Sequence, residues 1–284
     1  MDTTLIKTTT SNQLPVDSEA RQSTSLVTRL FNVYGRYESV FLKVLGVLSA
    51  ISLWEIAVIV GWANAEIISC PSRIAVAGLA YVTSNQFLKD GRSSGLAFLG
   101  GFGLAMAVGI LLGFAIGWFK RLEDFLDPII NFLYASPRIA LAPLLILWFG
   151  IDVESKIAII FLMSVFPLII NTVLGVHSVD KCLIDLARSF NASGWQIMRT
   201  IVIPSSVPFI VTGIRIGLGV ALIGVVVSEF VASTAGVGYT IQQAASNFEV
   251  DLVFVGLFVI GIVGAALTEL LRHVESRFAK WKSV

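Results

Sequence analysis

The sequence predicts an all-α, polytopic membrane protein with six transmembrane helices and a polar helical elbow between two of them. Hydrophobic residues make up 56% of the 284 residues, charged residues only 14%, and the mean hydropathy is +0.85. This composition is far from that of a soluble globular domain. Six apolar segments have about the ~20 residues that a helix needs to cross a bilayer. Lys and Arg are concentrated in alternate loops, as in multi-pass proteins.

The six expected spans cover residues 41–61, 95–118, 127–149, 155–176, 208–232 and 252–271. With the N-terminus inside, the cytoplasmic segments hold 14 of the 20 Lys and Arg residues. The outer loops hold four, which are Arg73, Lys89, Arg92 and Lys156. The positive-inside rule therefore predicts that both termini and the elbow lie on the cytoplasmic side.

Residues 1–38 are polar, rich in Ser and Thr, and contain no apolar h-region. We therefore expect a cytoplasmic tail rather than a cleaved signal peptide. This tail is either disordered or carries an amphipathic surface helix, through the apolar spacing of Leu26, Leu30, Val33, Tyr34 and Tyr37. Residues 39–284 then form the six-span domain.

Two features predict how the first spans connect and pack. Pro71 and the apolar positions after it indicate a helix that lies across the outer surface, in the long loop between the first and second spans. The second span repeats glycine every four residues at Gly109, Gly113 and Gly117, and the fifth repeats it at Gly213 and Gly217. Such small residues permit close helix packing in lipid, either within the chain or with a second copy.

The third span contains Pro137 and Pro143, each of which removes a backbone donor, so we expect it to be kinked or broken. Broken spans in transporters often line the substrate path, and a kink that serves packing alone is the other interpretation. Ionisable residues inside spans should face protein or water. Glu55 is one of these and a possible partner for either intramembrane arginine. The candidate translocation path comprises Pro137, Arg138, Pro143, Arg215 and Glu229, while a structural ion pair or snorkelling remains the alternative for both arginines.

The elbow covers about residues 182–204. Its apolar residues recur at i, i+3, i+4 and i+7, which predicts a short amphipathic helix with Leu183, Leu186, Ala187 and Phe190 on one face. Asn191 tolerates the left-handed conformation and can end this helix. Ser193 and Gln196 have the spacing of a capping box that begins a second helix, which Pro204 is expected to close.

The elbow resembles the Glu-Ala-Ala signature of ABC-importer permeases. Asp185, Leu186 and Ala187 stand at the positions of Glu-Ala-Ala, Asn191 at that of a glycine, and Ile201, Ile203 and Pro204 at the closing motif. The Pro-Arg-Ile-Ala-Leu-Ala-Pro-Leu run at 137–144 is similar to the nitrate, sulfonate, taurine and bicarbonate branch of these permeases. The Gly236-Val-Gly238 turn resembles a family turn that precedes a short helix near the pore mouth, and a simple turn is the alternative.

The resemblance implies that the elbow is a coupling helix that docks on a separate ATPase. The residues so implied are Leu183, Asp185, Leu186, Ala187, Phe190, Asn191 and Gly194. It also implies a location in the bacterial inner membrane, a second membrane subunit, most simply a copy of this chain, and an extracytoplasmic substrate-binding protein. ATP and Mg²⁺ would be bound by the ATPase and no cofactor by this chain. The implied cargo is a small oxyanion such as nitrate, bicarbonate, taurine or another alkanesulfonate. An elbow that lies on lipid headgroups is the other interpretation.

Several function classes lack their motifs. No Lys follows a Gly, so the chain has no phosphate-binding loop, and no basic run with interleaved aromatics supports nucleic-acid binding. No catalytic set indicates an enzyme. Cys70 and Cys182 fall on opposite sides of the membrane in this topology, so neither a disulfide nor a metal site is expected. An ion-coupled secondary transporter or channel is the alternative function, with Glu55, Glu229 and the arginines as its relay, but it would not need a docking elbow.

Overall fold

The computed structural model describes residues 42–62, 64–231 and 233–278. The tail 1–38 and its expected surface helix lie outside the described residues. The chain divides into a first unit, residues 1–62, and a second unit, residues 63–284. In the described part of the first unit, the helix Leu42–Ile59 is long and apolar enough to cross a membrane, as the first expected span requires.

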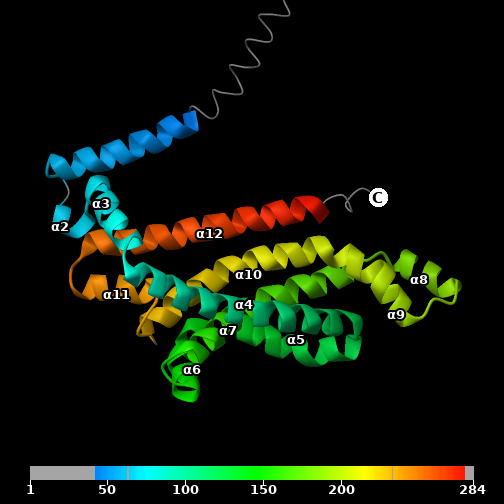
Figure 1. The fold of residues 1–284 in the computed structure, drawn as a ribbon. Helices are drawn as coiled ribbons and strands as arrows, with labels where there is room; N and C mark the ends of the chain where they lie inside the picture. The colour runs from blue at the N-terminus through cyan, green and yellow to red at the C-terminus, as the bar shows by residue number, and fades with distance from the viewer. Residues whose placement is uncertain (1–41, 63, 232, 279–284) are drawn as a thin grey trace, which may run out of the picture. The chain divides into compact units, whose positions relative to one another are not determined.

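The second unit is built of helices joined by short turns, and no strand occurs in the part of the chain that is described (Figure 1). The helices are α2 (Ala65–Ile68), α3 (Pro71–Val82), α4 (Asn85–Trp118), α5 (Lys120–Ala135), the 3₁₀ turn η1 (Arg138–Leu141), α6 (Ala142–Phe149), α7 (Val153–His177), α8 (Lys181–Ser189), α9 (Gly194–Ile197), the π-helical turn η2 (Met198–Val202), α10 (Ile203–Val231), α11 (Val237–Ser246) and α12 (Val250–Phe278).

The third span is broken, as its prolines predict. Among the described residues five helical runs can cross a membrane, and a sixth crossing is complete if Lys120–Ala135 and Arg138–Phe149, which bend by 90°, count as one span. Pro137 stands at the bend and Pro143 lies in the first turn of α6, where its missing N–H is not needed. The second span begins at Asn85 rather than at residue 95, because Ser84 caps it by accepting a hydrogen bond from the backbone N–H of Phe87.

Pro204 does not close the second elbow helix, and this expectation was wrong. α9, η2 and α10 run without interruption from Gly194 to Val231. The π-helical turn Met198–Val202 ends two residues before the proline. A π turn adds one residue to the ladder, and this offsets the ladder where the ring would otherwise meet the carbonyl of the preceding turn. The helix therefore continues into the membrane.

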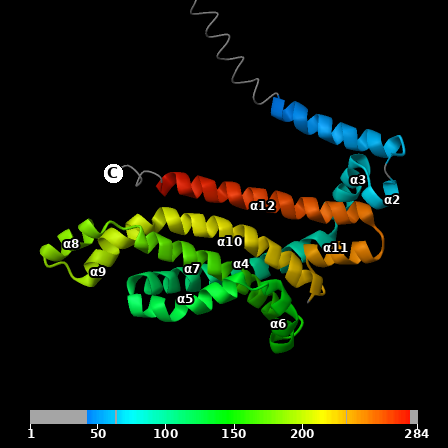
Figure 2. The same ribbon diagram turned by 180° about the vertical axis from the view of Figure 1, so that it is seen from behind.

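α7 is the central helix of the second unit, with α4 and α10 packed along it (Figures 1 and 2). More than half of its apolar window is buried, against about one third for α4 and α10. The main apolar cluster joins these three helices and includes Phe102, Ile160, Val165, Leu168, Ile169 and Leu218.

The repeated glycines of α4 pack against α7 of the same chain, which decides between the two partners that the sequence left open. Any Cβ at these positions would meet α7 at less than 3.0 Å, so only glycine permits this approach. The ideal Cβ positions lie 2.8 Å from Leu168 Cβ for Gly109, 2.5 Å from Thr172 Cβ for Gly113 and 2.8 Å from Val176 Cβ for Gly117. In α10, Gly213 meets α7 in the same way, with its ideal Cβ position 2.9 Å from Asn171 Cβ.

Candidate functional site

The two short helices of the elbow, α8 and α9, have the predicted local structure. Asp180 caps α8 by accepting a hydrogen bond of 2.8 Å from the backbone N–H of Cys182. α8 is followed by Asn191, whose φ of 57° is left-handed. Ser193 and Gln196 form the reciprocal capping box that begins α9. The elbow lies at the end of α7 and α10 that is opposite α11 (Figures 1 and 2).

Large apolar side chains of the elbow are left uncovered. Leu183 is 48% exposed, Leu186 54% and Phe190 79%. Trp195, which helical periodicity missed because it lies beyond the left-handed turn, is 70% exposed. Four exposed large apolar side chains on one short polar segment indicate a contact surface.

The other predicted elbow residues play smaller parts in this surface. Ala187 is half-buried and packs, with Ile184, onto a cluster made of Val176, Val179, Ile197 and Val202. It therefore belongs partly to the chain's own core. Asp185 is exposed and lies 3.6 Å from Arg188 in a surface ion pair. A Cβ at Gly194 would meet Trp118 at an ordinary 3.7 Å, so no close approach requires glycine there.

Arg138 occupies the break in the third span. Its Nη1 donates a hydrogen bond of 2.8 Å to the carbonyl oxygen of Met163 in α7. That carbonyl lacks its usual helical donor, because the residue four positions later is Pro167. The guanidinium carbon also lies 5.2 Å from the ring centre of Tyr134 and 5.7 Å from that of Phe166, within cation–π range.

The second intramembrane arginine has a carboxylate partner. Arg215 of α10 forms an ion pair and a hydrogen bond with Glu275 of α12. Glu275 lies near the end of the last span, where the sequence offered no reason to choose it as a partner. A structural ion pair was one of the two interpretations left open for Arg215, and the structure contains such a pair.

Glu229 belongs to a buried network at the end of the bundle that is opposite the elbow. Its carboxylate accepts hydrogen bonds from Ser94 Oγ and the backbone N–H of Gly238, both at 2.7 Å, and lies 3.8 Å from Lys156 Nζ. Both charged side chains are at most 2% exposed. Lys156, counted above with the outer loops, lies in the first turn of α7 and donates to Ser93 Oγ and to the Ala235 carbonyl.

Asp90 of α4 completes this network and is fully buried. It accepts four hydrogen bonds, from Tyr81 Oη, Thr240 Oγ1, Gln86 Nε2 and the backbone N–H of Gly236. Burial, together with the adjacent Asp90 carboxylate, raises the pKa of the Tyr81 hydroxyl well above its usual range, so that the hydroxyl remains a donor. We call Asp90, Lys156, Glu229 and the backbone of 235–238 the loop network.

The loop network accounts for the glycine turn that precedes α11. Gly236 has a φ of 138°, which disfavours residues with a Cβ, and its ideal Cβ position is only 2.1 Å from Glu229 Oε1. Gly238 offers its backbone N–H to the same carboxylate. Glycine is therefore required where this backbone approaches Glu229. Gly236 is the N-cap of the expected short helix, α11, and Val237 and Gly238 belong to its first turn.

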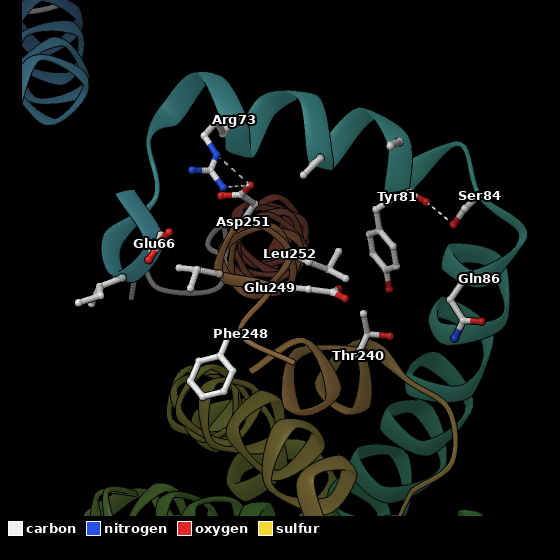
Figure 3. Close-up of a pocket in the computed structure, with 14 residues that line it drawn as sticks. Glu66, Arg73, Tyr81, Ser84, Gln86, Thr240, Phe248, Glu249, Asp251 and Leu252 are labelled. Atoms are coloured by element: carbon white, nitrogen blue, oxygen red, sulfur yellow. Dashed lines mark hydrogen bonds and ion pairs between the residues drawn. The ribbon is translucent and has the colours of Figure 1, made fainter. Parts of the chain in front are cut away.

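A groove of about 980 Å³ opens at the same end, between α2, α3, α11 and the start of α12 (Figure 3). Arg73 of α3 reaches across to Asp251, with an Nη2–Oδ2 distance of 2.9 Å, and this pair connects α3 to α12. Glu66 and Glu249 also line the groove. Phe248 at its edge is 88% exposed and has a left-handed φ of 61°.

The comparison with protein families agrees with the predicted class. Residues 105–280 match the family described as binding-protein-dependent transport system inner membrane component. A solved structure described as inward facing conformations of the MetNI methionine ABC transporter is similar over 70% of this chain and 96% of its own, with 17% identity and a TM-score of 0.47.

Three curated relatives have the following similarity. The putative aliphatic sulfonates transport permease protein SsuC of Bacillus subtilis is 35% identical over 82% of this chain and 84% of its own length. The taurine transport system permease protein TauC of Escherichia coli is 37% identical over 62% of this chain and 64% of its own length. The riboflavin transport system permease protein RibX of Chloroflexus aurantiacus is 32% identical over 81% of this chain and 86% of its own length. With more than half of its length matched by the family and a broken six-span helical fold, the chain belongs to the binding-protein-dependent transport system inner membrane components, the permease subunits of type I ABC importers.

Proposed function

We propose that this permease subunit forms the path for a small oxyanion in an ATP-driven importer, and that the elbow couples the path to a separate ATPase subunit. The observation that carries the proposal is the set of exposed apolar side chains on the elbow. Fully burying a side chain such as Leu or Phe contributes about 1.5–3 kcal/mol. A partner that covers Leu183, Leu186, Phe190 and Trp195 would therefore gain substantial affinity.

ATP and Mg²⁺ belong, in this proposal, to the ATPase, and the permease itself binds no cofactor. The sequence supports this division because it contains no Gly-Lys phosphate-binding loop. The ion-coupled alternative loses its support, because the chain belongs to the ABC-importer permeases and because Glu229 is already hydrogen-bonded within the loop network.

The proposed cargo is a sulfonate, including taurine, or a similar small oxyanion such as nitrate or bicarbonate. Relatives named for aliphatic sulfonates and taurine support this class. A relative named for riboflavin shows that similar permeases serve other solutes, so the binding protein is the natural place for fine selectivity. Of the candidate path residues, Pro137, Arg138 and Pro143 lie together at the break in the third span, whereas Arg215 and Glu229 are engaged in ion pairs.

The proposed orientation places both termini and the elbow in the cytoplasm and the groove outside, in line with the distribution of Lys and Arg. The groove would then be available to an extracytoplasmic binding protein. Its exposed Phe248 beside Glu66 and Glu249 suits a partner surface that offers an apolar pocket with basic groups around it. A second membrane subunit, most simply a copy of this chain, would complete the path.

The test of the coupling proposal is Leu186→Glu. An unpaired charge in the covered patch costs more than the ~1–3 kcal/mol of an unpaired polar group, so we expect ATPase affinity to fall at least five- to 150-fold. Leu186 is a better probe than Ala187, because a charge at Ala187 would also disturb the chain's own core. The measurement is co-purification and titration of the ATPase subunit with the detergent-solubilised permease.

The matched control is Arg188→Ala, two positions away on the same helix, with a side chain that is 65% exposed and paired only at the surface. It should bind the ATPase nearly as well as the unmodified chain. A Leu186→Glu permease that inserts normally, retains the ATPase at full affinity and transports at the unmodified rate would contradict the coupling role.

A further inference from the structure

Arg138 differs from Lys156 and Arg215 in having no counter-charge among the described residues. Lys156 lies 3.8 Å from Glu229, and Arg215 pairs with Glu275. Among the residues that the structure describes, no Asp or Glu forms an ion pair with Arg138. Its guanidinium is held only by a neutral carbonyl and two aromatic rings.

The guanidinium lies deep within the span. Its hydrogen-bond acceptor, the carbonyl of Met163, belongs to the eleventh of the 25 residues of α7. Arg138 is therefore level with the middle part of that helix. A charged side chain near the bilayer centre costs about 2.5–3.5 kcal/mol even on insertion scales, and it is normally compensated by a charge or by water.

The local fold explains part of this arrangement but not the charge. Pro167 leaves the Met163 carbonyl without its helical donor, and Arg138 satisfies it. A neutral amide or hydroxyl would do the same without bringing a permanent charge into the membrane. The structural role therefore accounts for a donor at this position, but not for a guanidinium.

The remaining donors of Arg138 are fixed in direction. The structure gives this side chain one hydrogen bond, while the guanidinium carries five N–H donors in a planar fork. Tyr134 and Phe166 both lie within cation–π range and restrict how this plane can turn. A planar fork with free parallel N–H groups matches carboxylate-like and phosphate-like oxyanions in a bidentate manner.

We propose that Arg138 is an oxyanion-binding residue inside the membrane, which receives the acidic group of the cargo at the break in the third span. The cargo itself would then supply the counter-charge that the chain lacks. The class of cargo, a sulfonate or similar anion, depends on the proposed function above, whereas the unpaired guanidinium is a feature of the structure alone. Sulfonate oxygens accept hydrogen bonds in the geometry that the guanidinium fork offers.

The experiment measures thermal stabilisation of the purified permease–ATPase complex in detergent, without binding protein. The probes are taurine, methanesulfonate, sulfate and nitrate, with methanesulfonamide as a neutral probe of similar shape. We expect the anions, but not the sulfonamide, to raise the melting temperature in a saturable way, since a ligand that binds only the folded state stabilises it. Arg138→Gln, which keeps a donor for Met163 but loses the charge, should weaken anion binding about ten- to 100-fold.

The control is Arg272→Gln, at an exposed arginine of α12 that pairs with Glu269 near the end of the last span. It should bind the anions as the unmodified chain does. If Arg138→Gln fails to assemble, Arg138→Lys keeps the charge without the fork, and its anion affinity should fall about tenfold.

The outcomes separate this site from the proposed function. Equal anion stabilisation of the unmodified and Arg138 variant complexes, or no stabilisation of the unmodified complex by any of the four anions, overturns the site. Uptake of taurine or methanesulfonate into proteoliposomes, with binding protein and ATP present, separately tests the cargo class. If the Arg138 variants take up these sulfonates as fast as the unmodified complex, the importer function stands and the site is refuted.

Discussion

The two ends of the helical bundle differ in whether the chain itself supplies partners for side chains that are costly to leave uncovered or unpaired. At one end, the loop network buries three ionisable side chains and supplies each with partners from the chain itself, so that Asp90 alone accepts four hydrogen bonds. At the other end, the elbow leaves its large apolar side chains uncovered, and its ion pair lies at the surface. One end matches its buried charged groups within the single chain, whereas the other leaves large apolar side chains exposed.

We therefore expect substitutions in the loop network to disturb the fold and substitutions in the elbow to disturb assembly. Charges withdrawn from solvent must be matched, because the desolvation penalty of each is several kcal/mol. Exposed apolar side chains contribute little to the stability of the isolated chain but much to association when a partner covers them. The following substitutions test this division, from the largest expected effect to the smallest.

Lys156→Met should have the largest effect on stability. It removes one member of a buried ion pair and leaves Glu229 without its counter-charge, which typically costs about 3–5 kcal/mol. The check is the melting temperature of the purified chain in detergent, together with proteolysis of the 233–240 loop. Arg188→Met at the elbow should stay within about 1 kcal/mol of the unmodified chain, because its ion pair is exposed.

The double variant Lys156→Met with Glu229→Gln sharpens this test. It removes both charges, so it should recover part of the stability that the single variant loses. If Lys156→Met alone unfolds at the temperature of the unmodified chain, the loop network does not hold the loop, and the contrast between the two ends is lost.

Gly236→Ala should have the next largest effect. A residue with a Cβ in this backbone region costs about 1–3 kcal/mol, and the new atom would also displace the Glu229 carboxylate, which lies 2.1 Å from the ideal Cβ position. Thermal unfolding and hydrogen exchange of α11 measure the loss. Gly219→Ala is the matched control, since that helical glycine has no atom within 4 Å of its ideal Cβ position and Ala favours helix.

Ser193→Ala should have the smallest effect, confined to the elbow. The substitution removes the N-cap acceptor for the Gln196 amide and should cost about 1 kcal/mol, within a usual range of about 0.5–2 kcal/mol. Hydrogen exchange at Gln196 should accelerate while exchange in α11 stays the same. Faster exchange in α11 as well would show that the two ends are not independent.

The local features of the molecule followed from the sequence, because they depend on neighbouring residues. The end of α8 at Asn191, the capping box and the break at Pro137 each rest on one turn of chain. Pro204 was the exception, since a π-helical turn allowed the helix to pass through it. The apolar exposure of Leu186 was consistent with the predicted face, but the inward direction of Ala187 depends on what packs behind it.

The long-range features did not follow, for a physical reason. The residues around Lys156 do not indicate that Glu229 of α10 lies beside it in the fold. Likewise, no local property of Glu275 marks it as the partner of Arg215. The Asp90 site combines residues of α3, α4 and α11 with the Gly236 turn. One sequence shows which residues are costly to bury, but not which distant groups compensate them.

The glycine contact between α4 and α7 also restricts how the subunit can move. Gly109, Gly113 and Gly117 recur every four residues, about 6 Å along the helix, and each sits over one α7 side chain. A slide of less than that distance would bring bulkier residues over Leu168, Thr172 and Val176. The glycine contacts therefore fix the register of α4 along α7, and we expect the two helices to move as one rigid body. By contrast, only 11% of the apolar window of α12 is buried, so packing within the chain fixes a smaller share of that helix.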